Sequence, residues 1–340
     1  MQKIISVCFN KNSDSFKDNS FNFMRIILAF AVIYSHSFEL LGEEAPCIFG
    51  RSLGNFAVHC FFALSGYFIM YSWRNSKSSI EYAVKRVLRI LPEYVVAMLL
   101  SECLALLCQD YSICPTPFIR NGVVWTLYYE ILAYIIVLIL GFFKCDNKNT
   151  IGALWGCSLL LIIVFQNSIE TTYTVIAPLF FMFISGMYLC VNDNLNIKSG
   201  GVVAVIMLVI VNFFSDFFPF IMKGLPLIYG PDMSRINTYI FLLCLPIAII
   251  FLGKELRCKC VVKTDISYGI YIYAWPIQQS LIFFCIQQGF ELKASYIFCI
   301  SSVITLIISA TSYWIIEKPM TIIRTKMLMF VNKVTRYGQQ

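Results

Sequence analysis

Charged residues are scarce in this chain, and their scarcity excludes a soluble protein. Asp, Glu, Lys and Arg make up 13% of the 340 residues, whereas they make up about 25% of an ordinary soluble domain. Hydrophobic residues make up 59%, and the mean hydropathy is +0.75. The composition therefore predicts an all-α polytopic membrane protein.

The sequence also lacks the patterns of a metal site. Cys258, Cys260 and Cys145 have no His nearby, and their spacing is not that of a zinc site. Most of the 14 cysteines lie within apolar stretches, where Cys acts as a small buried apolar residue. We therefore expect no metal, while a disulfide between Cys47 and Cys114 stays open as an alternative.

No internal repeat, low-complexity segment or attached soluble domain is visible in the sequence. Residues 1–20 are polar and lack the apolar core of a signal peptide. They are predicted to form a cytoplasmic N-terminal segment, followed by a membrane domain over 21–316 and a cytoplasmic C-terminal tail over 317–340.

About ten apolar stretches approach the roughly 20 residues that are needed to cross a bilayer. They cover residues 21–41, 53–73, 87–108, 122–143, 150–166, 172–191, 200–216, 235–252, 266–288 and 294–316. Pro92 interrupts the third, and the fifth and seventh are short.

The basic residues predict the orientation of these spans. With the N-terminus in the cytoplasm, most Lys and Arg fall in inside segments, as the positive-inside rule requires. Those predicted to lie outside are Arg51, Arg120, Lys223, Arg235 and Lys293. Both termini are therefore predicted to be cytoplasmic in a multi-pass plasma-membrane (inner-membrane) protein. The basic residues are spread over many short loops, which argues against nucleic-acid binding.

Two ionisable residues, Arg25 and His36, lie in the first span. Eleven positions correspond to about three helical turns, so both side chains are expected on one side of the helix, about 16 Å apart. Ionisable residues within a span usually mark function. A neutral imidazole can take a proton from a hydroxyl near pH 7, and we predict this role for His36. For His59, the other histidine, a packed structural role is preferred.

The fourth span carries Glu130 at a depth similar to that of His36. A carboxylate beside a histidine can orient the ring and stabilise its charged form. Glu130 is therefore a candidate partner of His36. A structural ion pair, or a hydrogen bond to Trp125 or a Tyr, is the alternative.

A basic cluster, Lys85, Arg86 and Arg89, lies at the inner end of the third span. Arginine forks bind phosphate in a bidentate manner, so the cluster could dock a nucleotide or an anionic lipid. Anchoring by the positive-inside rule explains it equally well. In the second span, Gly66 is expected to serve close helix packing, and Ser65 lacks the sequence context of a nucleophile elbow.

Taken together and in order, these segments resemble the membrane-bound acyltransferase-3 family, which includes bacterial envelope-glycan O-acetyltransferases. The matching segments are Arg25-x10-His36, FFALSG at 61–66, RVLRILP at 86–92, WTLYYE at 125–130, SYGIYIYAWPI at 267–277 and IEKP at 316–319. The resemblance covers residues 20 to about 320.

The resemblance implies a ten-helix core that moves an acyl group, often acetyl from cytoplasmic acetyl-CoA, to a sugar hydroxyl at or beyond the outer face. The implied catalytic residues are His36, Arg25 and Glu130, and the implied acyl-CoA contacts are Arg86, Arg89 and Lys85. Trp125, Ser65, Tyr268 and Tyr271 are possible supporting residues. One departure is clear, because Ala274 stands where many members have a second His.

The expected function is thus an integral-membrane O-acyltransferase. Its donor substrate would be acetyl-CoA, with no bound cofactor. The acceptor would be an envelope glycan or a lipid-linked sugar (O-antigen in lipopolysaccharide, capsule or exopolysaccharide), and membrane lipids would surround the protein. Two alternatives remain open: a transporter or flippase of a lipid-linked sugar or small anion, and a non-catalytic sensor. Paired interrupted helices, which a carrier should show, are not evident.

Overall fold

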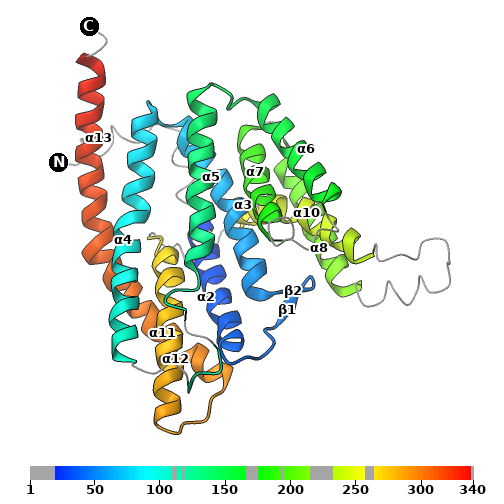
Figure 1. Ribbon diagram of the computed structural model, residues 1–340. Coiled ribbons are helices and arrows are strands. Elements are labelled where there is room, and N and C mark those ends of the chain that lie inside the picture. The colour runs from blue at the N-terminus through cyan, green and yellow to red at the C-terminus, as the bar shows by residue number, and fades with distance from the viewer. Residues whose placement is uncertain are drawn as a thin grey trace, which may run out of the picture.

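The structure is a computed structural model that describes residues 20–108, 113–116, 119–165, 175–192, 195–214, 233–256 and 264–337. These residues form helices, most of which alternate in direction along the chain (Figure 1). The helices are α2 (Phe21–Glu39), α3 (Leu53–Arg74), α4 (Ser79–Leu107), α5 (Val124–Phe142), α6 (Lys148–Val164), α7 (Ala177–Val191), α8 (Ile197–Phe214), α10 (Met233–Glu255), α11 (Ser267–Gln287), α12 (Ala294–Ser312) and α13 (Lys318–Tyr337).

Seven of the described helices are long and apolar enough to cross a membrane, and this count treats the run from α12 into α13 as one helix. Three of the ten expected spans are shorter: Lys148–Val164, Ala177–Val191 and Ile197–Phe213. The sixth span was expected to begin at residue 172, but α7 begins only at Ala177. An α-helix rises 1.5 Å per residue, so these three fall short of the usual core thickness of about 30 Å. The protein is therefore a predominantly helical membrane protein, with a short strand pair, β1 (Cys47–Ile48) and β2 (Arg51–Ser52), between α2 and α3.

Helix α4 begins earlier than the apolar stretch indicated, at Ser79 rather than at 87. The Ser78 side chain caps it by accepting a hydrogen bond from the Glu81 backbone N–H at 3.1 Å. A cap of this kind satisfies a donor that the first turn leaves free. Pro92 lies inside the helix and does not end it. Arg86 and Arg89 consequently lie inside a long helix and not at its mouth.

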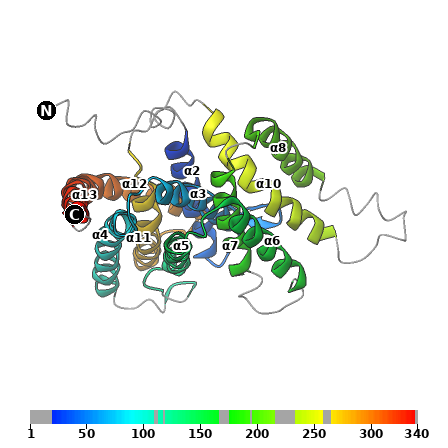
Figure 2. The ribbon, with the colours of Figure 1, turned by 90° about the horizontal axis from the view of Figure 1, so that it is seen from above.

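Helix α3 lies near the centre of the bundle and contacts α2, α4, α5, α7 and α10 (Figure 2). Its tightest contact is with α7. A Cβ on Gly66 would lie 1.9 Å from the Phe183 carbonyl oxygen, and one on Gly186 would lie 2.1 Å from that of Ala63. Two glycines thus let the two backbones touch, as small residues do in membrane bundles. The close packing predicted for Gly66 is confirmed.

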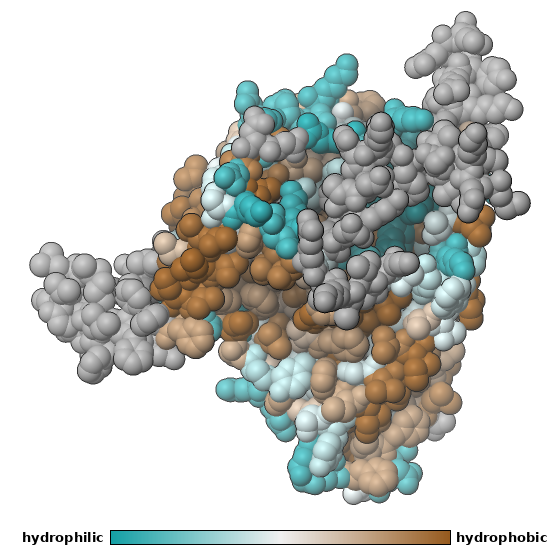
Figure 3. All heavy atoms as spheres, turned by 180° about the vertical axis from the view of Figure 1, so that it is seen from behind, coloured by the Kyte–Doolittle hydropathy of each residue, from teal (hydrophilic) through white to brown (hydrophobic). Residues whose placement is uncertain are grey.

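Seen from behind, the surface carries hydrophobic side chains across its middle, and hydrophilic ones gather towards its two ends (Figure 3). Exposed Leu, Ile and Val side chains on α4, α5 and α8 contribute to the apolar surface of the protein. In water this surface would be a liability, whereas in a bilayer it is the expected lipid contact.

The chain continues as a helix after the last expected span. A short π-helical segment, Tyr313–Glu317, joins α12 to α13, which packs against α4. Helix α2 begins, and α13 ends, on the same side of the bundle (Figure 1). This side, the upper one in Figure 1, is called the terminal side below.

Candidate active site

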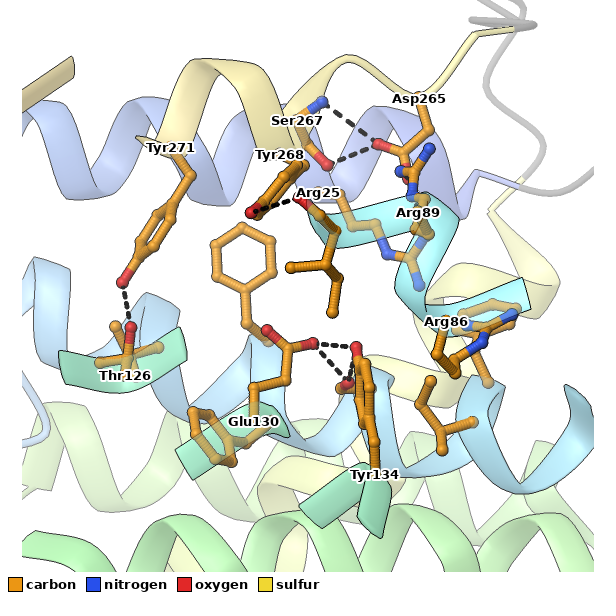
Figure 4. Close-up of a pocket in the computed structure, with 17 residues that line it drawn as sticks. Arg25, Arg86, Arg89, Thr126, Glu130, Tyr134, Asp265, Ser267, Tyr268 and Tyr271 are labelled. Atoms are coloured by element: carbon orange, nitrogen blue, oxygen red, sulfur yellow. Dashed lines mark hydrogen bonds and ion pairs between the residues drawn. The ribbon is translucent and has the colours of Figure 1, made fainter. Parts of the chain in front are cut away.

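A cavity of about 160 Å³ lies between α2, α3, α4, α5 and α11, and we call it the arginine cavity (Figure 4). Its polar lining residues are Arg25, Ser65, Arg86, Arg89, Thr126, Glu130, Tyr134, Asp265, Ser267, Tyr268 and Tyr271. The three arginines lie at one end of it, and Thr126 and Tyr271 lie at the other (Figure 4). The cavity therefore has a strongly charged end and an uncharged end.

Asp265 joins three helices at the charged end. Its Oδ2 accepts hydrogen bonds from Arg25 Nη1 at 3.0 Å and from Arg89 Nη2 at 2.9 Å. Arg89 also pairs with Glu317 at 3.2 Å. Burial alone would raise the pKa of Asp265, but Arg89 and Arg25 outweigh it and lower this pKa to about 2. Arg25 and Arg89, both predicted as functional, are thus matched by carboxylates of the same chain.

Arg86 differs from its neighbours because no carboxylate faces it among the described residues. Its Nη2 donates to the Ser72 hydroxyl at 3.1 Å, and its buried Nε has no partner in the described part of the chain. A buried donor without a partner is costly, which suggests a ligand. Lys85 instead pairs with Glu81 at 2.7 Å and does not line the cavity.

Glu130 lies on the wall of the arginine cavity and is held by two hydroxyls. Ser65 Oγ donates to its Oε1 at 2.8 Å, and Tyr134 donates to the same oxygen (Figure 4). Among the described residues, no contact joins Glu130 to His36. Of the expectations for Glu130, the hydrogen bond to a Tyr is the one that the structure shows.

A second cavity, of about 240 Å³, contains His36 and is called the histidine cavity. Polar and aromatic groups dominate its lining. They are His36, Glu39, Ser52, Asn55, Trp125, Thr126, Tyr271 and Trp275. Trp125, a possible supporting residue from the sequence, belongs to this cavity, whereas Ser65 and Tyr268 line only the arginine cavity.

The histidine itself is oriented by Glu39 from the same helix. His36 Nδ1 lies 2.9 Å from Glu39 Oε2, and Ser35 Oγ donates to the other oxygen of Glu39 at 2.9 Å. A carboxylate can only accept here, so Nδ1 carries the proton and Nε2 is left to act as a base. The ring meets Trp275 edge-to-face, with centroids 4.9 Å apart.

This arrangement corrects the predicted partner of His36, because Glu39, not Glu130, orients the ring. Residues three apart on a helix are neighbours, so the spacing of His36 and Glu39 could have revealed the pair. Helix α2 ends at Glu39. In the sequence, a charged residue at the end of a span is ordinary and does not indicate a role in the site. Equal depth in the membrane, the argument for Glu130, does not fix which carboxylate faces the ring.

The two cavities share part of their walls. Val58, Thr126 and Tyr271 line both. Arg25 and His36, although on one helix, open into different cavities. The chain thus contains a charged cavity and a histidine cavity that meet at one place.

The remaining sequence expectations concern residues outside the two cavities. His59 is buried in α3, with Nδ1 2.8 Å from the Asn55 carbonyl oxygen, in agreement with a structural role. Ala274 is buried in a cluster with Ile33 and Ile270 and lines neither cavity. Neither Cys47 nor Cys114 forms a disulfide, so the pairing that the sequence left open is absent from the described residues. Cys258 and Cys260 lie outside the described residues.

Comparison with known proteins decides the class of the protein. The acyltransferase-domain family, acyltransferase-3, matches residues 18–314. The chain belongs to the acyltransferase-3 family. This acyltransferase is also 28% identical to an O-acetyl transferase of Shigella phage Sf6, in an alignment 341 positions long that covers 89% of this chain and 96% of the phage protein.

No solved structure matches the acyltransferase. The family and the phage relative support an integral-membrane O-acyltransferase that transfers groups other than aminoacyl groups. They favour the enzyme over the transporter and the sensor that the sequence alone left open.

Proposed function

We propose that this acyltransferase transfers acetyl from cytoplasmic acetyl-CoA to a hydroxyl of a bacterial envelope or surface glycan. The observation that supports it best is the meeting of an arginine-rich cavity and a cavity with an oriented histidine at Thr126 and Tyr271. Each cavity would receive one substrate. The phage relative, printed as an O-acetyl transferase, favours acetyl as the group transferred.

The donor would enter at the charged end of the arginine cavity. Arg86 is the arginine there that no carboxylate engages among the described residues, and guanidinium groups bind phosphate well. Coenzyme A carries phosphates, and its thioester arm would extend along the cavity towards Tyr271. Arg25 and Arg89 would hold the helices that shape this end, through Asp265.

The acceptor would enter the histidine cavity from the opposite side of the membrane. Trp125 and Trp275 offer aromatic faces there, and Asn55 and Ser52 offer polar groups. Aromatic faces suit the apolar faces of sugar rings, and the polar groups suit their hydroxyls. A glycan or a lipid-linked sugar fits this lining.

The chemistry follows from the position of His36. Its Nε2 would take the proton of the acceptor hydroxyl while that oxygen attacks the thioester carbonyl carbon. Glu39 would stabilise the resulting imidazolium through Nδ1–H, as carboxylates do beside catalytic histidines. The imidazolium would then give its proton to the departing thiolate, which yields the ester and free coenzyme A.

The predicted topology agrees with this scheme. The charged end of the arginine cavity lies where α2, α4 and α11 begin, near the terminal side of the bundle. The positive-inside rule places that side in the cytoplasm, where acetyl-CoA is made. The plasma membrane, crossed several times, is the proposed location.

The test is direct. Purified protein in lipid vesicles is incubated with radiolabelled acetyl-CoA and smooth lipopolysaccharide, and label in the glycan is counted. The wild type should transfer label, and His36→Ala should lower the rate by about 10² to 10⁴, the range for loss of a general base. His59→Ala, which removes the structural histidine, is the control for a general effect of losing a buried imidazole. Full activity of His36→Ala in correctly folded protein would refute the assigned base.

A further inference from the structure

Tyr271 occupies the place where the two cavities meet. It projects from α11, lines both cavities, and faces Thr126 of α5. Its hydroxyl lies 2.6 Å from Thr126 Oγ1. In Figure 4 the pair lies at the end of the arginine cavity that is opposite Arg86. An acyl group brought from the arginine cavity towards His36 has to reach this pair.

The direction of the hydrogen bond follows from counting protons. Thr126 Oγ1 also contacts the Val123 carbonyl oxygen at 2.8 Å, and a carbonyl oxygen can only accept. Thr126 has one hydroxyl proton and gives it to Val123. Tyr271 is therefore the donor in its bond to Thr126, and its phenol proton lies between two residues that line both cavities.

The proposed reaction needs such a donor. When an alcohol oxygen attacks a thioester, the carbonyl electron pair moves onto oxygen, and preorganised donors at that point usually contribute much of the catalysis. The arginines are distant from this place in Figure 4, and Glu130 can only accept. Trp275 Nε1 already donates to the Ile119 carbonyl oxygen at 2.9 Å.

We propose that Tyr271 is a catalytic residue that donates its phenol proton in a hydrogen bond to the thioester carbonyl oxygen of the donor. The inference rests on the proposed function and names a residue that the function did not assign. In the resting protein Thr126 accepts this hydrogen bond, and the thioester oxygen replaces Thr126 when the acyl group arrives.

The step is balanced. The acceptor oxygen forms a bond to the carbonyl carbon and gives its proton to His36 Nε2. The carbonyl oxygen becomes an oxyanion and accepts from Tyr271. The oxyanion then re-forms the carbonyl, the C–S bond breaks, and the thiolate takes the proton from His36. Tyr271 keeps its proton throughout and returns to Thr126.

The deciding variant is Tyr271→Phe, which removes one oxygen. We expect kcat for transfer from acetyl-CoA to lipopolysaccharide to fall by about 10² to 10³, as on loss of an oxyanion donor. The KM for acetyl-CoA should stay within about twofold, because the hydrogen bond strengthens only as the oxyanion forms.

Two further variants separate this role from a structural one. Tyr273→Phe removes a buried phenol two residues away, which contacts Ser312 and lines neither cavity, and it should leave kcat unchanged. Thr126→Val removes only the resting acceptor. The fold-loss in kcat for Thr126→Val should be at least about tenfold smaller than that for Tyr271→Phe. If the hydrogen bond between the two residues served only to hold the helices together, both variants would lose kcat equally.

The outcomes separate the inference from the proposed function. If the wild type transfers label and Tyr271→Phe keeps its kcat, the donor role is wrong and the function stands. Equal losses in Tyr271→Phe and Thr126→Val would also overturn the donor role. If the wild type transfers no label, the proposed function fails and the inference fails with it. Thermal unfolding of each variant in detergent confirms that the compared proteins are folded.

Discussion

At His36 the proposed base and its orienting carboxylate come from one turn of one helix. Glu39 holds Nδ1 at 2.9 Å, and Ser35 holds Glu39. Glu130 lines the other cavity, where Ser65 and Tyr134 hold it. Substitutions of Glu39 and Glu130 are therefore expected to have different effects on catalysis, although both residues line the proposed reaction path.

Glu39→Gln should lower kcat far more than Glu130→Gln. An amide in place of Glu39 favours the wrong tautomer of His36, and we expect a loss of at least about 100-fold, below the roughly 10⁴-fold known for a Ser-His-Asp triad. Gln at 130 can still accept from Ser65, so the loss there should be under about tenfold. Initial rates with saturating acetyl-CoA measure both, and a larger loss in Glu130→Gln would reverse the assignment.

Substitutions of Arg86 and Arg89 should also differ in their effects, the first on donor binding and the second on stability. Arg86→Ala should raise the KM for acetyl-CoA by about tenfold or more, because one charge-assisted hydrogen bond contributes about 1.5–3 kcal/mol. Arg86→Lys should restore part of the affinity, since it keeps the charge and loses the fork.

Arg89→Ala should instead lower stability. It leaves Asp265 and Glu317 without this partner. Breaking a fully buried ion pair costs about 3–5 kcal/mol, and the loss here should be smaller because the Arg89 side chain is 33% exposed. Thermal unfolding and folded yield report this loss. An Arg89→Ala protein of normal stability with weakened donor binding would contradict the division of roles.

The individual site residues could be predicted from the sequence only in part. Arg25, His36 and Glu130 stand out because ionisable residues are rare in spans, and each lines a cavity. Their partners are set by tertiary packing. Asp265 lies in a polar stretch before α11, so nothing in the sequence indicates that it pairs with Arg25 and Arg89.

At the level of helices, α3 lines both cavities and packs against α7 through their shared glycine contact. Gly66→Ala should lower thermal stability markedly, because its Cβ would overlap the Phe183 backbone at 1.9 Å. Gly156→Ala is the matched control. A Cβ there would meet nothing within 4 Å, and Ala in a helix is favoured over Gly by up to about 1 kcal/mol. Equal melting temperatures for the two variants would show that the α3–α7 contact carries little energy.

Apolar runs predicted where the helices lie, and most boundaries agree within a few residues. The largest difference is α4, which starts at Ser79 because a serine cap and a polar first turn extend the helix beyond the apolar stretch. Hydropathy detects lipid contact and not helix length, so it also missed that α13 continues as a helix over Lys318–Tyr337. Helix neighbours could not be predicted, because small-residue contacts identify no partner on their own.

For the whole molecule, the scheme requires the two cavities to open towards opposite compartments. Cys47 is free and exposed beside β2, at the end of the bundle opposite the terminal side, and Cys145 follows α5 on the terminal side. In variants that keep only one of these cysteines, a membrane-impermeant maleimide should label Cys47 in intact spheroplasts. It should label Cys145 only after lysis. The reverse pattern would contradict the predicted orientation.

The pairing of His36 with Glu39 has a consequence for how the enzyme tolerates motion. Their separation is set by the backbone geometry of one helical turn, so tilting or sliding of α2 moves His36 and Glu39 together. A bundle that loosens to admit two bulky substrates would disturb contacts between helices first. The hydrogen bond between His36 and Glu39 would persist while the helices move apart and close again. The pair would therefore keep its geometry through each cycle of substrate entry and product release.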